Sequence, residues 1–318
     1  MTLLKYGLGV GRIVKATVFG KSTKLSASLV VPPSKVTAIN ISPNPSQVVA
    51  YNNITNAWSN NENDGVHLMY PSMLTAPLQF EVLSSDSFPF PLLGLVHLSN
   101  RIQQFEHITL NTKCKIEVSL EDKLTVHEKG YIVNMICEIF CENTNKLLWR
   151  STGGMFHFDK NAKAASEASR SSHPLYQSEI KQENMEGTVA REIWHHSADM
   201  GRRYAAVSGD YNPIHLSALS ASLFGFKKGA ILHGMWTKAR AVTALMPPTH
   251  TLSSTGSSSD TPMADIFVEF KTPLYLPSST VLCAKESVAA SRKEVIFEVK
   301  GNDVEQLPHV RGRCSWNV

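Results

Sequence analysis

Several features that mark other classes of protein are missing from this chain of 318 residues. No stretch approaches the roughly 18 consecutive apolar residues that a membrane helix needs. Charged residues make up only 18% of the chain, and 31 basic against 27 acidic residues leave a net charge of +4. This nearly even balance of basic and acidic residues does not indicate nucleic-acid binding. With 42% hydrophobic residues, the sequence predicts a globular protein whose partners include neither a membrane nor nucleic acid.

Cysteine is scarce, and several site motifs are absent. The five cysteines form no Cys-x-x-Cys pair, and Cys137 and Cys141 share one face of a predicted strand, which favours buried thiols over a zinc or redox site. A reducing compartment follows. His195 and His196 are adjacent, so in a strand they point to opposite faces and suit one metal ion poorly. No Gly-x-Ser-x-Gly elbow and no Gly-x-Gly-x-x-Gly fingerprint is present.

Acidic residues are missing from the first 61 positions, which hold six Lys or Arg. This bias is typical of a transit peptide. The basic residues interrupt the apolar ones, however, so no secretory core forms, and the terminal Ser315–Val318 is not a peroxisomal Ser-Lys-Leu signal. We expect a cytoplasmic protein, with import into an organelle as the alternative.

A polar stretch divides the chain into two halves. Residues 161–187 are rich in Ala, Ser, Lys, Gln and Glu and lack an apolar stripe, which predicts a linker. We therefore expect an N-terminal extension (1–35), a first domain (36–160), this linker, and a second domain (188–318). The Ser- and Thr-rich composition of residues 250–262 predicts a surface loop.

The two halves repeat one plan. In the second half, apolar residues at helical spacing predict a buried helix within Gly229–Met246, and Gly65–Leu83 is its less regular counterpart with two prolines. Strands follow each helix, at 95–98, 114–119, 131–141 and 146–150 in the first half and at 266–270, 281–284, 294–300 and 310–316 in the second. The pattern predicts an α+β protein in which antiparallel sheets wrap around each helix and join edge to edge.

The densest cluster of polar functional residues is Tyr204–His215, which reads Tyr-Ala-Ala-Val-Ser-Gly-Asp-Tyr-Asn-Pro-Ile-His. Asn212 followed by proline predicts a helix start, with Asp210 in the preceding turn and His215 in the first helical turn. A carboxylate and an imidazole brought together by a turn are suited to proton transfer. The helix N-terminus also disfavours a charged imidazolium. The structural alternative is that Asp210 and Asn212 only cap the helix while His215 packs.

The stretch from Tyr204 to Ala221 resembles the hydratase 2 signature of the MaoC-like family of R-specific enoyl-CoA hydratases and dehydratases. That signature is an aromatic residue, a spacer, Ser-Gly-Asp-x-Asn-Pro-aliphatic-His, and a small residue six positions later. Ile231–Trp236 is similar to the Ile-x-His-Gly-Met element that opens the central helix of the family's hot-dog fold. The resemblance covers about 130 C-terminal residues closely and the first half loosely, as in double hot-dog chains.

The resemblance implies that Asp210 and His215 are the catalytic pair that holds the water added to, or removed from, a 2-enoyl thioester. Asn212 would hold the turn, and the backbone N–H of Gly234 would stabilise the negative charge on the thioester oxygen. Close helix–sheet packing is the alternative reason for Gly234. Which of Asp210 and His215 takes which proton stays open. Further substrate-binding residues implied by the two motifs are Ser208, Gly209, His233 and Met235.

The phosphates of a pantetheine thioester need a basic surface. Arg202 and Arg203 precede the first motif, and Lys227 and Lys228 precede the central helix. We also expect Lys238 and Arg240 to reach toward the phosphates from the helix. Exposed basic pairs are often plain solvated surface, which is the alternative for each of them.

The first half lacks the catalytic motif, since Val48–Trp58 contains no Asp and no Asn-Pro-x-His. We expect this half to form the other wall of an acyl tunnel that has room for a long chain.

The sequence thus predicts a hydro-lyase that acts on acyl-CoA or acyl carrier protein thioesters in fatty-acid metabolism, without a metal or redox cofactor. The alternatives are a hot-dog acyl-CoA thioesterase and a non-catalytic acyl-thioester binding protein. A homodimer stays open, because the pairing of the two halves already closes sheet edges as a dimer would.

Overall fold

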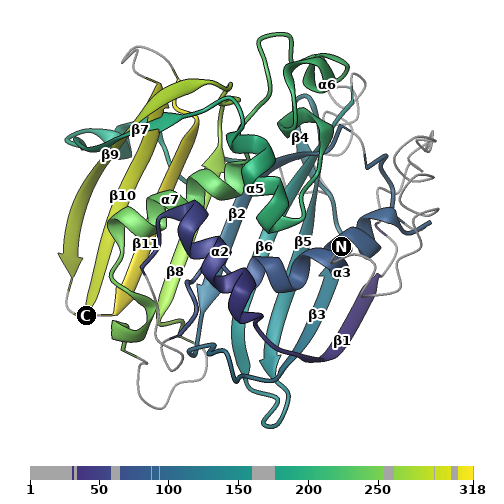
Figure 1. Cartoon of the computed structure of the whole chain (residues 1–318), viewed down its shortest axis with the longest axis vertical. Helices are drawn as coiled ribbons and strands as arrows, with labels where there is room; N and C mark the ends of the chain where they lie inside the picture. The colour runs from purple at the N-terminus through teal and green to yellow at the C-terminus, as the bar shows by residue number, and fades with distance from the viewer. Residues whose placement is uncertain are drawn as a thin grey trace.

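The computed structural model describes residues 31, 34–58, 65–86, 88–92, 94–159, 176–253, 261–289, 291–301 and 307–317. Its dominant feature is a single sheet of eleven strands, all paired antiparallel (Figure 1). The first half supplies β1 (Lys35–Ile41), β2 (Val96–Gln104), β3 (Cys114–Leu120), β4 (Thr125–His127), β5 (Gly130–Cys141) and β6 (Leu147–Phe158). The second supplies β7 (Val189–His196), β8 (Ala264–Phe270), β9 (Ser278–Ala289), β10 (Arg292–Gly301) and β11 (Val310–Asn317).

The two halves join at the middle of this sheet. The strand order is β1-β3-β5-β6-β2-β8-β11-β10-β9-β7, with β4 paired to β5, so β2 of the first half lies against β8 of the second. In that junction Asn100 is opposite Val268 and Ile102 is opposite Ile266. Pairing the two inner edges leaves only β1 and β7 as edge strands. The predicted edge-to-edge α+β arrangement is confirmed.

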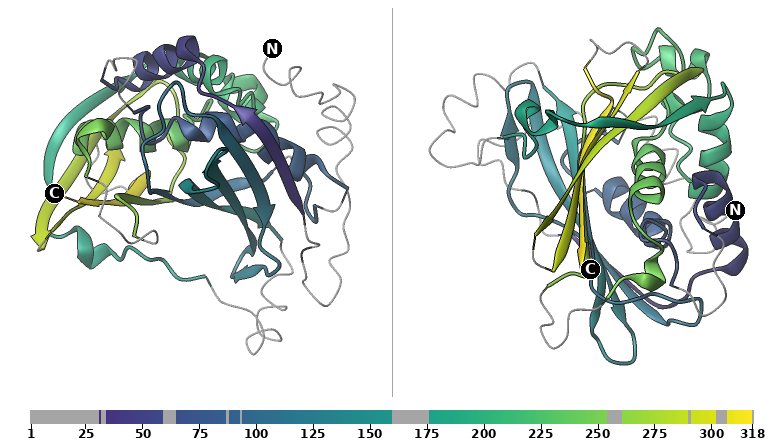
Figure 2. Two further views of the ribbon diagram at one scale, coloured as in Figure 1. Left: turned by 90° about the horizontal axis from the view of Figure 1, so that it is seen from below. Right: turned by 90° about the vertical axis from the view of Figure 1, so that its left-hand side faces the viewer.

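The helices lie together on one face of the curved sheet (Figures 1 and 2). They are α2 (Pro45–Thr55), α3 (Pro71–Ser84), α5 (Met200–Ser208), α6 (Ala218–Ser222) and α7 (Gly234–Leu245). There are also three short 3-10 turns, η2 (Gln182–Met185), η3 (Pro213–His215) and η4 (Thr249–Thr251), of which η2 lies on the opposite face. The helix predicted within 229–246 begins later than its first glycine. Residues 230–232 are instead extended, because the N–H of Ile231 donates to Ile214 and that of Leu232 to Leu274.

One hydrophobic core serves both halves. A single cluster of buried side chains contains residues of α3 and β5 as well as residues of α7, β8 and β10. Two polar contacts cross it: Trp236 Nε1 donates to the carbonyl of Ile54 at 2.8 Å, and His67 Nε2 lies 3.2 Å from Thr243 Oγ1. The central helix of the second half is therefore packed against the first half as well as against its own sheet.

The end of the predicted linker covers the opposite face of the sheet. Ile180 and Met185 pack on Phe267, and the buried carboxylate of Glu269 accepts hydrogen bonds from Tyr176, Ser178 and Glu179. Residues 161–175 of the linker lie outside the described residues, as do 1–30, 32 and 33 of the predicted extension and 254–260 of the predicted loop. The domain limits therefore stay a prediction.

All five cysteines are free. Burial raises the pKa of Cys114, Cys137 and Cys314 to about 12, as expected for structural thiols in an apolar core. Within the described ranges, no helix is long and apolar enough to cross a membrane.

Candidate active site

The turn after α5 presents Asp210 to a cavity. Gly209 ends the helix in the left-handed conformation (φ 78°), which favours glycine, and its N–H donates to Ala205. Ser208 is buried, and its Oγ accepts a hydrogen bond from the N–H of Asp210 at 3.2 Å. The Asp210 side chain is 54% exposed and accepts from the N–H of Asn212 at 3.2 Å. The Ser-Gly-Asp sequence therefore fixes the direction in which this carboxylate leaves the chain.

Asn212 caps the next turn as predicted, with its Oδ1 accepting from the N–H of Ile214 at 3.3 Å. The predicted helix is only the three-residue turn η3, and α6 starts separately at Ala218. Gly201 of α5 packs against the backbone of His215, where a Cβ would overlap the His215 carbonyl. Glycine at this position lets α5 and the catalytic turn approach each other closely.

A backbone carbonyl sets the protonation state of His215. Its Nδ1 lies 2.7 Å from the carbonyl oxygen of Ile231. A carbonyl only accepts, so Nδ1 carries the proton and Nε2 keeps a lone pair. Burial lowers the pKa of His215, while the nearby Asp210 and the Ile231 carbonyl raise it in part. The ring is therefore neutral at pH 7, with Nε2 able to accept a proton.

His233 is the second imidazole of the site. Its ring stacks on that of His215 with 3.7 Å between centroids, and the edge of the Tyr204 ring approaches it at 4.9 Å. Its Nε2 donates to the carbonyl of Asp210 at 3.0 Å. Burial and the neighbouring His215 lower the pKa of His233 to about 4. His233 is thus a neutral donor that holds the Asp210 backbone and supports the His215 ring.

Among the described residues, one group has side chains and spacing that could hold a metal ion. It consists of Asp210, His215 and His233, whose potential ligand atoms lie within 4.8 Å of one another. Two of the four ring nitrogens donate to carbonyls, which leaves His215 Nε2 and His233 Nδ1 with lone pairs. Nitrogens with lone pairs can accept a proton. The absence of a metal cofactor stays a prediction.

The N-terminus of α7 borders the same cavity at Gly234 and Met235. The helix has no side-chain cap, and its first hydrogen bonds to His233 come from Trp236 and Thr237. The N–H groups of Gly234 and Met235 are thus the free donors that a helix start provides. A Cβ on Gly234 would lie 2.5 Å from the ring of Phe270. Gly234 is therefore closely packed and lines the cavity, while the role of its N–H toward a thioester oxygen stays a prediction.

The cavity has a volume of about 620 Å³, within the usual range for small-molecule sites. Its polar end consists of residues 208–215 and the start of α7. Both halves line it, and the apolar side chains from the first half include Met73, Phe80, Leu83, Leu95 and Met155.

The basic residues predicted near the phosphates lie outside this lining. Arg202, Arg203, Lys227 and Lys228 are exposed, and Arg202 Nη1 donates to the carbonyl of Leu216 at 2.9 Å. Their role in binding phosphates stays a prediction.

The expectation for the two basic residues of α7 is wrong. Lys238 is fully buried in the core, and Arg240 pairs with Glu192 at 2.7 Å while lying over the Trp194 ring. Neither side chain is free to reach a phosphate.

Sequence reasoning missed three residues around the cavity. His97 and Asn100 of β2 line it from the first half, and Gly201 supports the catalytic turn from behind. The two β2 residues lie beside or within a stretch predicted only as a strand, and no spacing rule relates them to Asp210.

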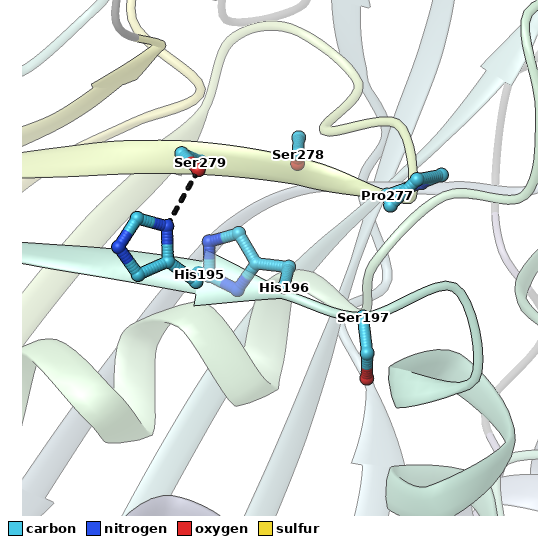
Figure 3. Close-up of a pocket in the computed structure, with 6 residues that line it drawn as sticks. All are labelled: His195, His196, Ser197, Pro277, Ser278 and Ser279. Atoms are coloured by element: carbon cyan, nitrogen blue, oxygen red, sulfur yellow. Dashed lines mark hydrogen bonds between the residues drawn. The ribbon is translucent and has the colours of Figure 1, made fainter.

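A second hollow of about 540 Å³ lies at the β7–β9 edge and shares no lining residue with the cavity (Figure 3). His195 is exposed, with Nδ1 2.8 Å from Ser279 Oγ, whereas His196 is buried and its Nε2 lies 2.9 Å from Thr280 Oγ1. Because each histidine is bound to a different partner, the predicted poor geometry for one metal ion agrees with the structure.

The fold is that of a hot-dog protein, and comparison with known proteins identifies the family. Residues 179–255 match the MaoC-like domain. The chain is also 30% identical over 209 residues to the 3-hydroxyacyl-thioester dehydratase X of Mycobacterium tuberculosis, covering 66% of this chain and 69% of that protein. The chain belongs to the MaoC-like dehydratase family, which confirms the predicted family and hydro-lyase class.

Solved structures show the same double hot-dog fold. HtdX of Mycobacterium tuberculosis has a TM-score of 0.66 at 24% identity, with 89% of this chain and 100% of that chain covered. A MaoC-like dehydratase from Phytophthora capsici has a TM-score of 0.65 at 16% identity, covering 92% and 98%.

Proposed function

We propose that the protein interconverts trans-2-enoyl thioesters and (3R)-3-hydroxyacyl thioesters by adding or removing water. The observation that carries the proposal is the pairing of Asp210 with a His215 whose Nε2 is kept unprotonated, at the polar end of a cavity lined by apolar side chains. Hydration needs a base for water and a proton donor for the α-carbon, and this pair can serve both needs.

In the hydration direction one water lies between the Asp210 carboxylate and His215 Nε2. As its oxygen bonds to carbon 3, the pair takes up a proton and delivers a proton to carbon 2 on the same face. The free N–H groups at the start of α7 stabilise the charge that develops on the thioester oxygen. Losing such a donor typically costs about 2.7–4 kcal/mol of transition-state stabilisation.

The carrier of the acyl group is CoA or acyl carrier protein, and the acyl chain occupies the part of the cavity that the first half lines. The reaction proceeds without a metal or redox cofactor and belongs to fatty-acid metabolism. A cytoplasmic location and a homodimer complete this proposal, and cell fractionation and sedimentation of the purified protein test them.

The direct test follows the loss of enoyl-thioester absorbance with crotonyl-CoA and a longer trans-2-enoyl-CoA, with chiral analysis of the product. We expect Asp210→Asn and His215→Ala each to lower kcat/KM by about 10²–10⁴ while leaving the fold intact. The control is His195→Gln, which changes an exposed histidine outside the cavity.

The outcomes separate the alternatives. An R-configured product from wild type, lost in both site variants and kept in the control, supports the proposal. Activity only on the acyl carrier protein thioester keeps the reaction and identifies the carrier. Release of free thiol from a saturated acyl-CoA would identify a thioesterase instead, and binding without turnover of either carrier would identify a binding protein.

A further inference from the structure

A polar group interrupts the apolar wall that the first half contributes to the cavity. Asn100 on β2 and Ser151 on β6 both line the cavity, and only 3% and 6% of their surfaces are exposed. Asn100 Nδ2 donates to Ser151 Oγ at 2.9 Å. Buried polar side chains in such a wall cost free energy unless a partner satisfies them, so their hydrogen bonds are informative.

Lys238 fixes the orientation of this pair from behind. Its ammonium group has no exposed surface and donates to Asn100 Oδ1 at 2.7 Å, to the Asn100 carbonyl at 3.0 Å and to the Ile266 carbonyl at 3.1 Å. Because an ammonium only donates, the atom of the amide that it contacts must be the oxygen. The amide nitrogen of Asn100 is then turned toward Ser151.

The chain of hydrogen bonds that starts at Lys238 ends at the Ser151 hydroxyl. Its oxygen accepts from Asn100, so its own proton is available for donation. Within the part of the chain that the structure describes, no acceptor for this proton is found. Each hydrogen bond in this chain polarises the next, which strengthens the Ser151 donor at its end.

A second group with unused hydrogen-bonding capacity lies beside this donor. The His97 ring lies over Gly153, where a Cβ would lie 2.9 Å from its Nε2 and 3.7 Å from Asn100 Nδ2. The buried Nε2 of His97 has no hydrogen-bond partner among the described residues. Burial lowers the pKa of His97 to about 4, so the ring is neutral. The bare backbone of Gly153 leaves room in the wall at this point.

The position of the group relates it to the acyl chain rather than to the reacting carbons. Lys238 follows Gly234 by four residues in α7, which is about 6 Å along the helix axis. The Phe270 ring packs on Gly234 and lies 5.2 Å from the His97 ring, and these residues line the same cavity as Ser151. An acyl chain bound by its thioester at Gly234 can extend along this lining toward Ser151.

We propose that Asn100 and Ser151, held by Lys238, form a subsite for an oxygen atom on the acyl chain, so that the substrates are acyl thioesters with a hydroxyl group several carbons beyond the reacting double bond. This inference rests on the proposed function, because it places the thioester at the start of α7. A hydroxyl oxygen accepts from Ser151, and its proton is available to His97 Nε2 after a small ring rotation. An unsubstituted chain leaves the Ser151 donor unpaired.

The experiment compares trans-2-dodecenoyl-CoA with analogues that carry one hydroxyl group at successive positions from carbon six to carbon ten. Hydration gives kcat/KM for each, and calorimetry gives the dissociation constants of the matching saturated thioesters. We expect wild type to prefer one hydroxylated isomer by about tenfold, the worth of one hydrogen bond in a buried site. Ser151→Ala should abolish this preference, measured as the ratio of kcat/KM for the hydroxylated and unsubstituted chains within the same variant.

The matched control is Cys137→Ala, which alters another cavity residue outside the hydrogen-bonded group. If its preference matches that of wild type while Ser151→Ala loses it, the subsite is supported. If wild type hydrates all chains equally well, the subsite is refuted and the proposed function stands. If no chain is hydrated, the proposed function fails, and the binding constants alone decide the subsite: a preference that Ser151→Ala abolishes supports it, and equal affinities refute it.

Discussion

At the scale of single residues, the electrostatic environment of His215 decides how the site works. Burial lowers its pKa below 6.5, and the charge of Asp210 partly offsets this effect. We expect the pKa of His215 to lie below 6.5 in the wild type and lower still in Asp210→Asn. Without the carboxylate, the imidazolium loses the attraction of a nearby negative charge. NMR titration of labelled histidine Cε1–H signals measures both values, with His215→Ala to assign the signal.

The same titration can also contradict this prediction. A His215 pKa that rises on replacing Asp210 would mean that the carboxylate does not favour the imidazolium. A wild-type pKa above 7 would mean that the ring is mostly charged at neutral pH and cannot accept a proton from water.

At the scale of elements, α7 is placed by contacts on two sides. Its first residue lies under the Phe270 ring, so Gly234→Ala introduces a clash between Cβ and the ring. We expect a loss of about 1–3 kcal/mol in the free energy of unfolding together with a fall in kcat. Urea unfolding and steady-state kinetics measure the two effects.

The double variant Gly234→Ala with Phe270→Leu separates packing from chemistry. The smaller side chain makes room for the new Cβ, and the backbone N–H at residue 234 is unchanged. Both stability and kcat should therefore recover in part. Recovery of stability without any recovery of kcat would show that Phe270 itself is needed for activity.

Lys238 holds the second turn of α7 to both strands of the junction, and its burial has a consequence for stability. Its pKa falls from 10.5 to about 7 in the folded protein because the charged form is desolvated. Between these two values the unfolded chain binds a proton that the folded chain lacks, so this group makes stability rise with pH from about 7 toward 10.5. Below pH 7 its full burial cost is present.

We therefore expect wild type to gain stability relative to Lys238→Met between pH 7 and pH 9, by up to about 1.4 kcal/mol per pH unit. Urea unfolding midpoints at several pH values measure this difference, with Lys285→Met, a partly exposed lysine of β9, as the control. A difference that stays constant over this range would show that the lysine keeps its proton in the folded protein.

At the scale of the whole molecule, the sequence predicted more of the plan than of the cavity. Periodicity and the paired Gly-helix-strand order predicted both halves and their junction, and the Ser-Gly-Asp-x-Asn-Pro-x-His spacing predicted which side chains meet at the turn. These features are local. The pairing of β2 with β8 is not, and it alone brings Asn100 next to Lys238, a contact between residues 138 positions apart.

The error over Lys238 has the same origin. A lysine on an apolar helix is usually expected to extend to solvent. Only the tertiary structure shows that Lys238 donates in the core to the Asn100 carbonyl, the Asn100 side-chain oxygen and the Ile266 carbonyl. Local patterns thus predicted the catalytic turn, whereas the shape and polarity of the acyl cavity depend on contacts between the halves.

That dependence makes the first half a determinant of chain length. Met155 of β6 lines the cavity and packs between the main core and the smaller cluster around Phe90 and Tyr131. We expect Met155→Trp to fill this end of the cavity, raising KM for long 2-enoyl-CoA substrates at least tenfold while leaving crotonyl-CoA turnover unchanged, because the short chain ends before it. Val288→Trp, on the exposed surface of β9, is the control for a bulky substitution. An unchanged KM for the long chain would instead place the acyl group outside the first half.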